Sequence, residues 1–250
     1  MYRMLLILAA GLWAATGWTA DAVQFSADMY KKGPRGEEFA RIYVGDQQTR
    51  SEMTQNDRKL ILIVDTRNQV SQLIDPANQS YMEQRGNMPP PDAGKDEGEV
   101  DPCRGIQGAQ CKRLGEEKVA GRPAIKWDMT SQQQGKTIQS TLWIDTERDT
   151  ILRQTTSTGT SLEIEMMGKE TLSGRPVEKW KVSFSQSGGS VQESYRWYDP
   201  QLNLDIREEL PGGYVRELRN IKVGKQDPGL FKVPAGFRKV TPQQSQQRTR

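Results

Sequence analysis

Apolar and polar residues alternate with a period of two along much of the chain. In the stretch TSLEIEMM, Leu162, Ile164 and Met166 fall on one side and two glutamates fall on the other. The segments 138–144 and 179–184 alternate in the same way. Such a period places successive side chains on opposite faces of a β-strand. The pattern therefore predicts half-buried strands of an antiparallel sheet with one wet face.

The run from Leu60 to Val64 is different, because it is apolar on both faces. It predicts a central strand whose second side is covered, either by helices or by a bound ligand. Turn signals rich in Gly, Pro, Asn and Asp separate the alternating segments. The segments between these turns predict about a dozen strands.

An internal repeat lies in the second half of the chain. Residues 115–127 read GEEKVAGRPAIKW and residues 168–180 read GKETLSGRPVEKW, with seven of 13 positions identical. The similarity continues to Trp143 and Trp197, each followed two residues later by Asp. A fainter third copy is expected around Phe25, Tyr43 and Arg50.

The repeat predicts consecutive meanders of one sheet. Trp127 and Trp180 should occupy equivalent positions with similar burial, as should Trp143 and Trp197. Repeated meanders extend a sheet, and a sheet this large has to curl. The expected fold is mainly β, with a curved antiparallel sheet forming an unclosed half-barrel.

The charged residues are nearly balanced and exclude several classes of function. The chain holds 35 Lys and Arg, 32 Asp and Glu, and no histidine, which gives a formal net charge of +3. Without an imidazole there is no Ser-His or Cys-His nucleophile pair and no histidine-bearing zinc site. Because the charges of both signs are spread along the chain, we expect no nucleic-acid partner. We also expect no enzymatic activity, no cofactor and no metal.

The N-terminus has the pattern of an export signal. A short basic start is followed by an apolar stretch from Met4 to Trp18 and by an Ala-x-Ala site ending at Ala22. This pattern predicts a signal peptide over 1–22, cleavage before Val23, and a soluble periplasmic product. The mature chain should consist of one domain over 23–240 and a disordered polar tail over 241–250, for which a helical tail is the alternative.

Two cysteines occur, Cys103 and Cys111, next to a loop over 86–102 that is rich in Pro, Gly and acidic residues. An oxidising compartment permits them to pair, so we expect a disulfide that fastens the base of this loop. A redox-active pair is a weaker interpretation, because such pairs usually read C-x-x-C.

Three stretches resemble the LolA/LolB-like periplasmic carriers. These are Ser51 to Gln84, WIDTERDTILRQ from Trp143 to Gln154, and the ending LFKVPAGFRKV from Leu230 to Val240. The resemblance implies an unclosed barrel with a few short helices across its mouth. It also implies a concave apolar face that holds the acyl chains of lipoproteins or of another lipid. Gly45-Asp46 stands where the lipoprotein carrier has Arg-Pro, so a generic lipid-binding role is the implied function.

We therefore expect a periplasmic binding or carrier protein for a lipid or an acylated partner, with a membrane-bound delivery or regulatory protein as a further partner. The alternative is a non-enzymatic sensor or adaptor of the same fold that binds an inner-membrane regulatory protein. A carrier should show a continuous, accessible apolar cavity, whereas an adaptor should show a filled barrel and a polar, charged outer patch. The candidate ligand-binding residues are Leu60, Leu62, Val64, Leu142, Ile144, Leu162, Ile164 and Val182.

Overall fold

The structure is a computed structural model that describes residues 23–86, 101–103, 106–133 and 135–241. The predicted signal peptide, most of the loop over 86–102 and nearly all of the predicted tail lie outside the described residues. Among the described residues, no helix is long and apolar enough to cross a membrane.

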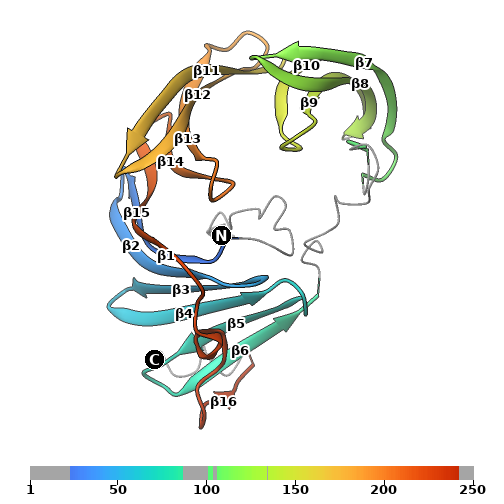
Figure 1. Cartoon of the computed structure of the whole chain (residues 1–250). Helices are drawn as coiled ribbons and strands as arrows, with labels where there is room; N and C mark the ends of the chain where they lie inside the picture. Colours follow the sequence, from blue (N-terminus) through green and yellow to red (C-terminus); the bar gives the residue numbers. More distant parts are fainter. Residues whose placement is uncertain (1–22, 87–100, 104–105, 134, 242–250) are drawn as a thin grey trace.

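The described residues form one sheet of 16 strands (Figure 1). The strands are β1 (Phe25–Gly33), β2 (Gly36–Val44), β3 (Gln48–Gln55), β4 (Arg58–Asp65), β5 (Val70–Asp75), β6 (Ser80–Arg85), β7 (Gln110–Val119), β8 (Arg122–Gln133), β9 (Lys136–Asp145), β10 (Ile151–Thr156), β11 (Ser161–Leu172), β12 (Arg175–Ser185), β13 (Gln192–Asp199), β14 (Leu204–Leu210), β15 (Tyr214–Val223) and β16 (Arg238–Lys239). Their order in the sheet is β16-β6-β5-β4-β3-β2-β1-β15-β14-β13-β12-β11-β10-β9-β8-β7.

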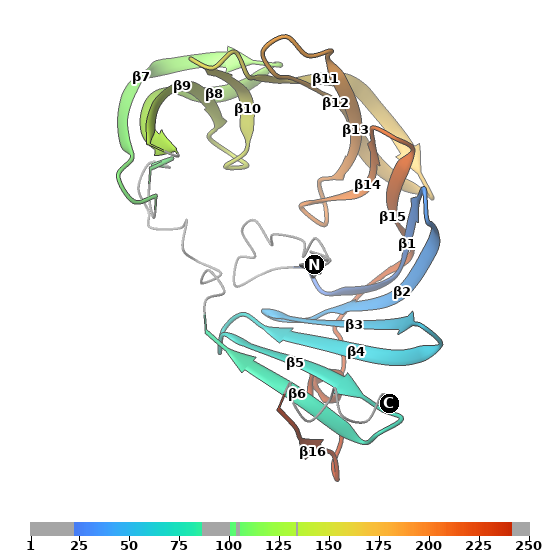
Figure 2. The ribbon, with the colours of Figure 1, turned by 180° about the vertical axis from the view of Figure 1, so that it is seen from behind.

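The sheet curls into an open ring whose edge strands are β16 and β7 (Figures 1 and 2). This arrangement confirms the predicted mainly β fold and unclosed half-barrel. The predicted strand number was too low, because short hairpins follow one another from β1 to β6 with tight turns between them. The few short helices expected across the mouth are not found in the described chain, whose helical structure is confined to one 3-10 turn, η1 (Pro228–Phe231).

The two copies of the repeat fold in the same way. The hairpin turns Ala120-Gly121 and Ser173-Gly174 both have positive φ at each position, as a two-residue hairpin turn of the favoured hand requires. Each copy also has a β-bulge before its turn, between β7 and β8 and between β11 and β12. The local backbone geometry therefore follows the sequence repeat, including its irregularities.

The tryptophans confirm the predicted equivalence. Trp127 and Trp180 are 8% and 6% exposed, and Trp143 and Trp197 are 8% and 7% exposed. Trp143 pairs with Arg153 across β9 and β10, and Trp197 pairs with Arg207 across β13 and β14.

The fainter third copy is confirmed only in part. Tyr43 pairs with Arg50 across β2 and β3, as the tryptophans of the other copies pair with their arginines. Phe25, however, does not occupy the place of Trp127. The residue opposite Tyr43 is Ser26, so Ala27 is the counterpart of Trp127 in register.

The strand β4 is apolar on both faces because the chain covers one of them itself. Ile61 and Ile63 pack against Phe231 of η1 in a cluster that also contains Ile74 of β5. Arg50 Nη1 donates to the carbonyl oxygen of Leu230 at 2.9 Å, and β16 extends the sheet beyond β6. We call residues 228–240 the C-terminal segment; it supplies the cover that the sequence predicted for this strand.

The approach of the C-terminal segment requires a glycine at position 45. A Cβ placed on Gly45 would lie 2.7 Å from two ring carbons of Phe231. We predict that Gly45→Ala lowers the free energy of unfolding by about 1–3 kcal/mol, because the Phe231 ring has to leave its position. Chemical denaturation measures this loss.

A double-mutant cycle with Phe231→Leu is the control for this prediction. The smaller side chain leaves room for a methyl group, so the two substitutions should cost less together than the sum of their separate costs. Additive costs would show that Gly45 and Phe231 do not interact.

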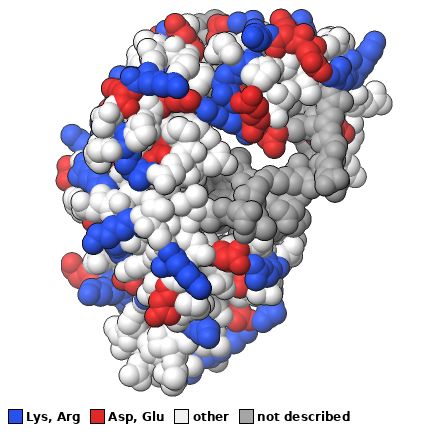
Figure 3. Space-filling view, viewed as in Figure 1, with Lys and Arg blue, Asp and Glu red and all other residues white. Residues whose placement is uncertain are grey.

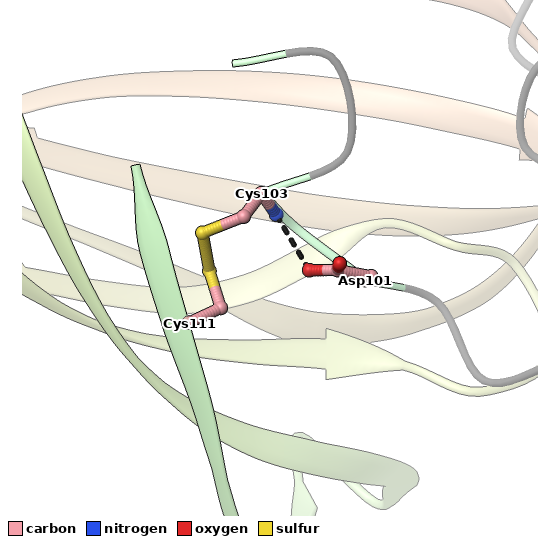
Figure 4. Close-up of a disulfide and its surroundings, with 3 residues drawn as sticks. All are labelled: Asp101, Cys103 and Cys111. Atoms are coloured by element: carbon pink, nitrogen blue, oxygen red, sulfur yellow. Dashed lines mark hydrogen bonds between the residues drawn. A yellow bond between two sulfur atoms is a disulfide. The ribbon is translucent and has the colours of Figure 1, made fainter. Parts of the chain in front are cut away.

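Cys103 and Cys111 form the predicted disulfide, with the two Cα atoms 5.8 Å apart (Figure 4). The backbone N–H of Cys103 donates to Asp101 Oδ1 at 2.8 Å. The bond joins the segment that precedes β7 to the second residue of that edge strand, so it fastens the end of the loop as expected.

We predict that unreduced, denatured protein contains no free thiol. Reduction should lower the free energy of unfolding by about 2.5 kcal/mol, because a short closed loop in the unfolded chain is released. Thiol titration and denaturation with and without reductant measure both quantities. Two titratable thiols in protein purified from an oxidising compartment would contradict the pairing.

Candidate functional site

The strand register sorts side chains onto two faces, because residues directly opposite one another in antiparallel strands share a face. In the second half of the sheet, Leu142 lies opposite Trp127 and Gln154, and Gln154 lies opposite Leu162. We call this side of the sheet the apolar face. The opposite side carries Trp143 and Trp197, and we call it the aromatic-charged face.

All eight candidate ligand-binding residues lie on the apolar face, on strands β4, β9, β11 and β12. Leu60, Leu62 and Leu162 are half-buried, and the other five are buried. The structure does not bring the eight into one group. Those on β4 are separated from the rest by the strands β3, β2, β1, β15, β14 and β13.

Half-buried apolar side chains lie on the apolar face of every strand from β1 to β6, with Ser51 as the one polar residue among them. Met29, Ala40, Met53 and Leu60 lie opposite one another in one row, and Ile42, Ser51, Leu62, Leu73 and Met82 form the next. All of these are half-buried. We call these two rows the apolar band. The C-terminal segment packs on the other face of the same strands, so it leaves the apolar band uncovered.

The apolar face of β8 to β12 is packed more tightly. Ile125, Trp127, Leu142 and Ile144 form one buried cluster, and Ile164, Trp180 and Val182 form another. Leu162 and Met166 border the second cluster and stay half-buried. This half of the face therefore offers less accessible surface than the apolar band.

The aromatic-charged face satisfies its polar groups within each repeat. Trp143 Nε1 donates to Glu117, and Lys126 and Arg153 lie over the indole ring at 4.8 and 5.4 Å from its centroid. The second copy repeats these contacts, with Lys179 and Arg207 at 4.8 and 5.3 Å from the centroid of the Trp197 ring. Figure 3 shows charged side chains along the outer contour of the upper part of the molecule.

A buried ion pair closes each repeat. The Arg122 guanidinium donates to Asp145, and the Arg175 guanidinium donates to Asp199. Both aspartates are fully buried and also accept backbone N–H groups from the turn that follows them. The arginine of each Gly-Arg-Pro motif is thus explained by structure, since it neutralises a carboxylate that caps a turn.

Charged residues interrupt the apolar face on β13 to β15, between the apolar band and the buried clusters. Arg196 lies opposite Trp180 on one side and Glu208 on the other, and Glu208 lies opposite Arg216. In the adjacent row Tyr198 lies opposite Asp205. We call Arg148, Glu178, Arg196, Tyr198, Asp205, Glu208 and Arg216 the charged strip.

Two ion pairs of the charged strip are closed. Arg148 Nη1 lies 2.7 Å from Glu178 Oε2, and Arg216 Nη2 lies 2.6 Å from Glu208 Oε2. The Arg148 guanidinium also stacks on the ring of Tyr198, 4.0 Å from its centroid. These contacts hold charges of both signs on a face that is otherwise apolar.

Asp205 has the most strongly raised pKa of the described carboxyl groups. Burial raises the pKa of Asp205 to about 6, and Glu208 raises it as well, while Arg196, Arg216 and Arg148 lower it. Arg196 Nη1 lies 3.9 Å from Asp205 Oδ2, which is too long for a hydrogen bond. The nearby arginines therefore offset only part of the cost of burying the Asp205 carboxylate.

The pattern of the sequence does not reveal the charged strip. Its members alternate with residues of the aromatic-charged face, so each strand looks like an ordinary half-exposed strand of charged residues. The signal in the sequence is that Arg196 and Glu208 stand at the alternate positions of their strands that face the same side as Trp180. Reading that signal requires the strand register.

The sequence matches no protein-family model and no curated protein. Similar solved structures include a LolA superfamily protein from Nitrosomonas europaea, with a TM-score of 0.35 and 10% identity over 88% of this chain and 93% of that chain. A putative outer membrane lipoprotein-sorting protein domain from Vibrio parahaemolyticus has a TM-score of 0.33 and 10% identity over 84% and 89%. These names agree with the sequence resemblance. At TM-scores below 0.5 the likeness supports no inference about a ligand.

We predict that Asp205→Asn stabilises the protein more at pH 7 than at pH 4. The folded-state pKa of about 6 lies above the unfolded value of 3.8, so the folded protein binds this proton more tightly and loses stability as the pH rises between the two values. Removing the carboxylate should recover up to about 3 kcal/mol at pH 7. Denaturation at both pH values measures the difference.

Asp28→Asn serves as a control of opposite sign. Hydrogen bonds from Asn220 and Arg41 lower the pKa of Asp28, so its carboxylate stabilises the folded state above the unfolded pKa and ceases to do so in acid. Asp28→Asn should therefore be more destabilising at pH 7 than at pH 3. The same sign for both variants would refute this interpretation of Asp205.

Proposed function

We propose that this protein is a non-enzymatic periplasmic binding or carrier protein for a lipid or an acylated partner, held on the concave apolar face of the half-barrel. The observation that carries the proposal is the apolar band. Its side chains are partly exposed on six neighbouring strands, while the C-terminal segment packs on the opposite face of β2 to β6.

An apolar surface of this extent favours an apolar partner. Soluble proteins rarely expose a large contiguous apolar patch unless it binds something. Burying an acyl chain on such a surface stabilises the complex by about 0.8 kcal/mol per CH₂ before ordering costs. Met29, Met53 and Met82 contribute flexible side chains that adapt to ligands of different shape. This composition fits a carrier that has to bind and release.

The tightly packed clusters on β8 to β12 favour the alternative function, a sensor or adaptor that binds a regulatory protein, for that half of the sheet. A sensor or adaptor needs a filled interior and binds a regulatory protein elsewhere. Leu142, Ile144 and Val182 are buried among their neighbours, as that function requires. The two candidates differ in whether the apolar band binds an acyl chain.

We predict that an acyl-chain fluorescent probe binds with micromolar affinity and is displaced by phospholipid. Leu62→Glu should weaken probe binding at least tenfold, because a carboxylate would have to be buried under the chain. Leu162→Glu, on β11, should have a smaller effect if the apolar band is the main site. Fluorescence titration and thermal denaturation of each variant measure binding and stability separately.

Thr54→Glu is the matched control, since Thr54 lies on the neighbouring strand β3, is exposed, and belongs to the opposite face. It introduces the same charge and should leave probe binding unchanged. If the probe does not bind the unsubstituted protein, the carrier function is wrong and the adaptor function is favoured.

A further inference from the structure

The charged strip occupies a specific place on the apolar face. Its members lie on β12 to β15 and in the β9–β10 turn, with the apolar band beginning on β1 at one side and Trp180 and Val182 of β12 at the other. Neighbouring strands are about 4.8 Å apart, so β13 and β1 are separated by about 14 Å along the sheet. A ligand with an acyl chain on the apolar band can therefore place its head group on the strip.

Arg196 is the arginine of the strip that has donors to spare. Its Nε is buried and has no hydrogen-bond partner among the described residues, and its guanidinium stays 3.9 Å from Asp205. The side chain as a whole is 38% exposed while its Nε is buried, so a ligand approaches from the exposed part of the side chain. An unsatisfied buried donor is costly, and an oxyanion that accepts from it recovers that cost.

Trp180 supplies a second donor next to Arg196. The two residues are directly opposite one another on β12 and β13, and Trp180 Nε1 is buried without a hydrogen bond of ordinary geometry. Burial raises the pKa of the nearby Glu178 carboxyl, and Arg148 and, to a smaller extent, the Trp180 indole lower it, with a net lowering. Trp127 Nε1, at the equivalent position of the first repeat, is also buried without a partner, whereas Trp143 and Trp197 on the aromatic-charged face both donate to glutamates.

We propose that Arg196 and Trp180 bind an oxyanion, a carboxylate or a phosphate group, carried by an acyl lipid, and that Asp205 competes with this oxyanion for Arg196. This inference rests on the proposed function, since the acyl chain lies on the apolar band. It adds the chemical class of the ligand and a position for its head group.

The competition by Asp205 makes binding depend on pH. The charged and titratable groups that face Asp205 are Arg148 from the β9–β10 turn, Glu178 on β12, Arg196 and Tyr198 on β13, Glu208 on β14 and Arg216 on β15. Counted with Asp205 ionised, the strip holds three arginines and three carboxylates. Protonation of Asp205 leaves one positive charge in excess, so an anionic ligand should bind more tightly at pH 5 than at pH 7.5.

The experiment compares three single-chain lipids of equal acyl length by displacement of a fluorescent probe. Lysophosphatidylglycerol carries a phosphate anion, the fatty acid carries a carboxylate, and monoacylglycerol is uncharged. At pH 7.5 we expect at least one anionic lipid to bind about tenfold more tightly than monoacylglycerol, as one charge-assisted hydrogen bond allows. The better of the two anionic lipids identifies the head group.

The variants separate the head-group site from the apolar band. Arg196→Gln and Arg196→Lys should abolish most of the preference for anionic lipid and leave the affinity for monoacylglycerol unchanged, and Trp180→Phe should reduce the preference. Asp205→Asn should remove the difference between pH 5 and pH 7.5 that lysophosphatidylglycerol shows with the unsubstituted protein. Arg153→Gln, at a similarly exposed arginine of the aromatic-charged face, should change none of these values.

Two outcomes would overturn the inference in distinguishable ways. Equal binding of charged and uncharged lipids, unaffected by Arg196→Gln, would refute the head-group site and leave the proposed function intact. Failure of every lipid to bind would refute both. Circular dichroism and denaturation midpoints of the variants show whether any loss of binding comes from misfolding.

Discussion

The pairing of β1 with β15 is the interaction on which the rest of the structure depends. Phe25 lies opposite Val223 and Lys32 lies opposite Val215, so the first strand of the domain joins the last strand of the long meander in the middle of the sheet. Without this ladder, β1 to β6 and β7 to β15 would be two separate sheets. Bringing such distant segments together costs loop-closure entropy before the ladder forms.

The same pairing decides how the faces of the two halves join. The row from Trp180 through Arg196, Glu208 and Arg216 continues on β1 at Lys31. A shift of one residue between β1 and β15 would exchange the two faces of one half relative to the other. The continuity of the apolar face, with the charged strip between its two apolar parts, is therefore a consequence of this single register.

The two faces of the sheet are stabilised by different chemistry. On the aromatic-charged face, lysines and arginines stack on tryptophan rings, and glutamates accept the indole N–H groups. Such cation–π contacts and hydrogen bonds let aromatic rings pack on a face that carries many charges. On the apolar face, the C-terminal segment is absent because Phe231 packs on the opposite side of β4 and β5. The position of that segment leaves the apolar band accessible.

The sequence by itself determined the local structure of this protein. The period of two places Leu162 and Ile164 on one face of a strand, and the repeated Gly-Arg-Pro motif predicts two equivalent meanders, because backbone alternation and turn chemistry act over a few residues. The tertiary structure alone decided three other matters: the number of strands, the cover of β4 by Phe231, and the assembly of the charged strip from four strands and a turn. These depend on register between segments apart in sequence, and Arg196 becomes a neighbour of both Trp180 and Asp205 only when that register is set.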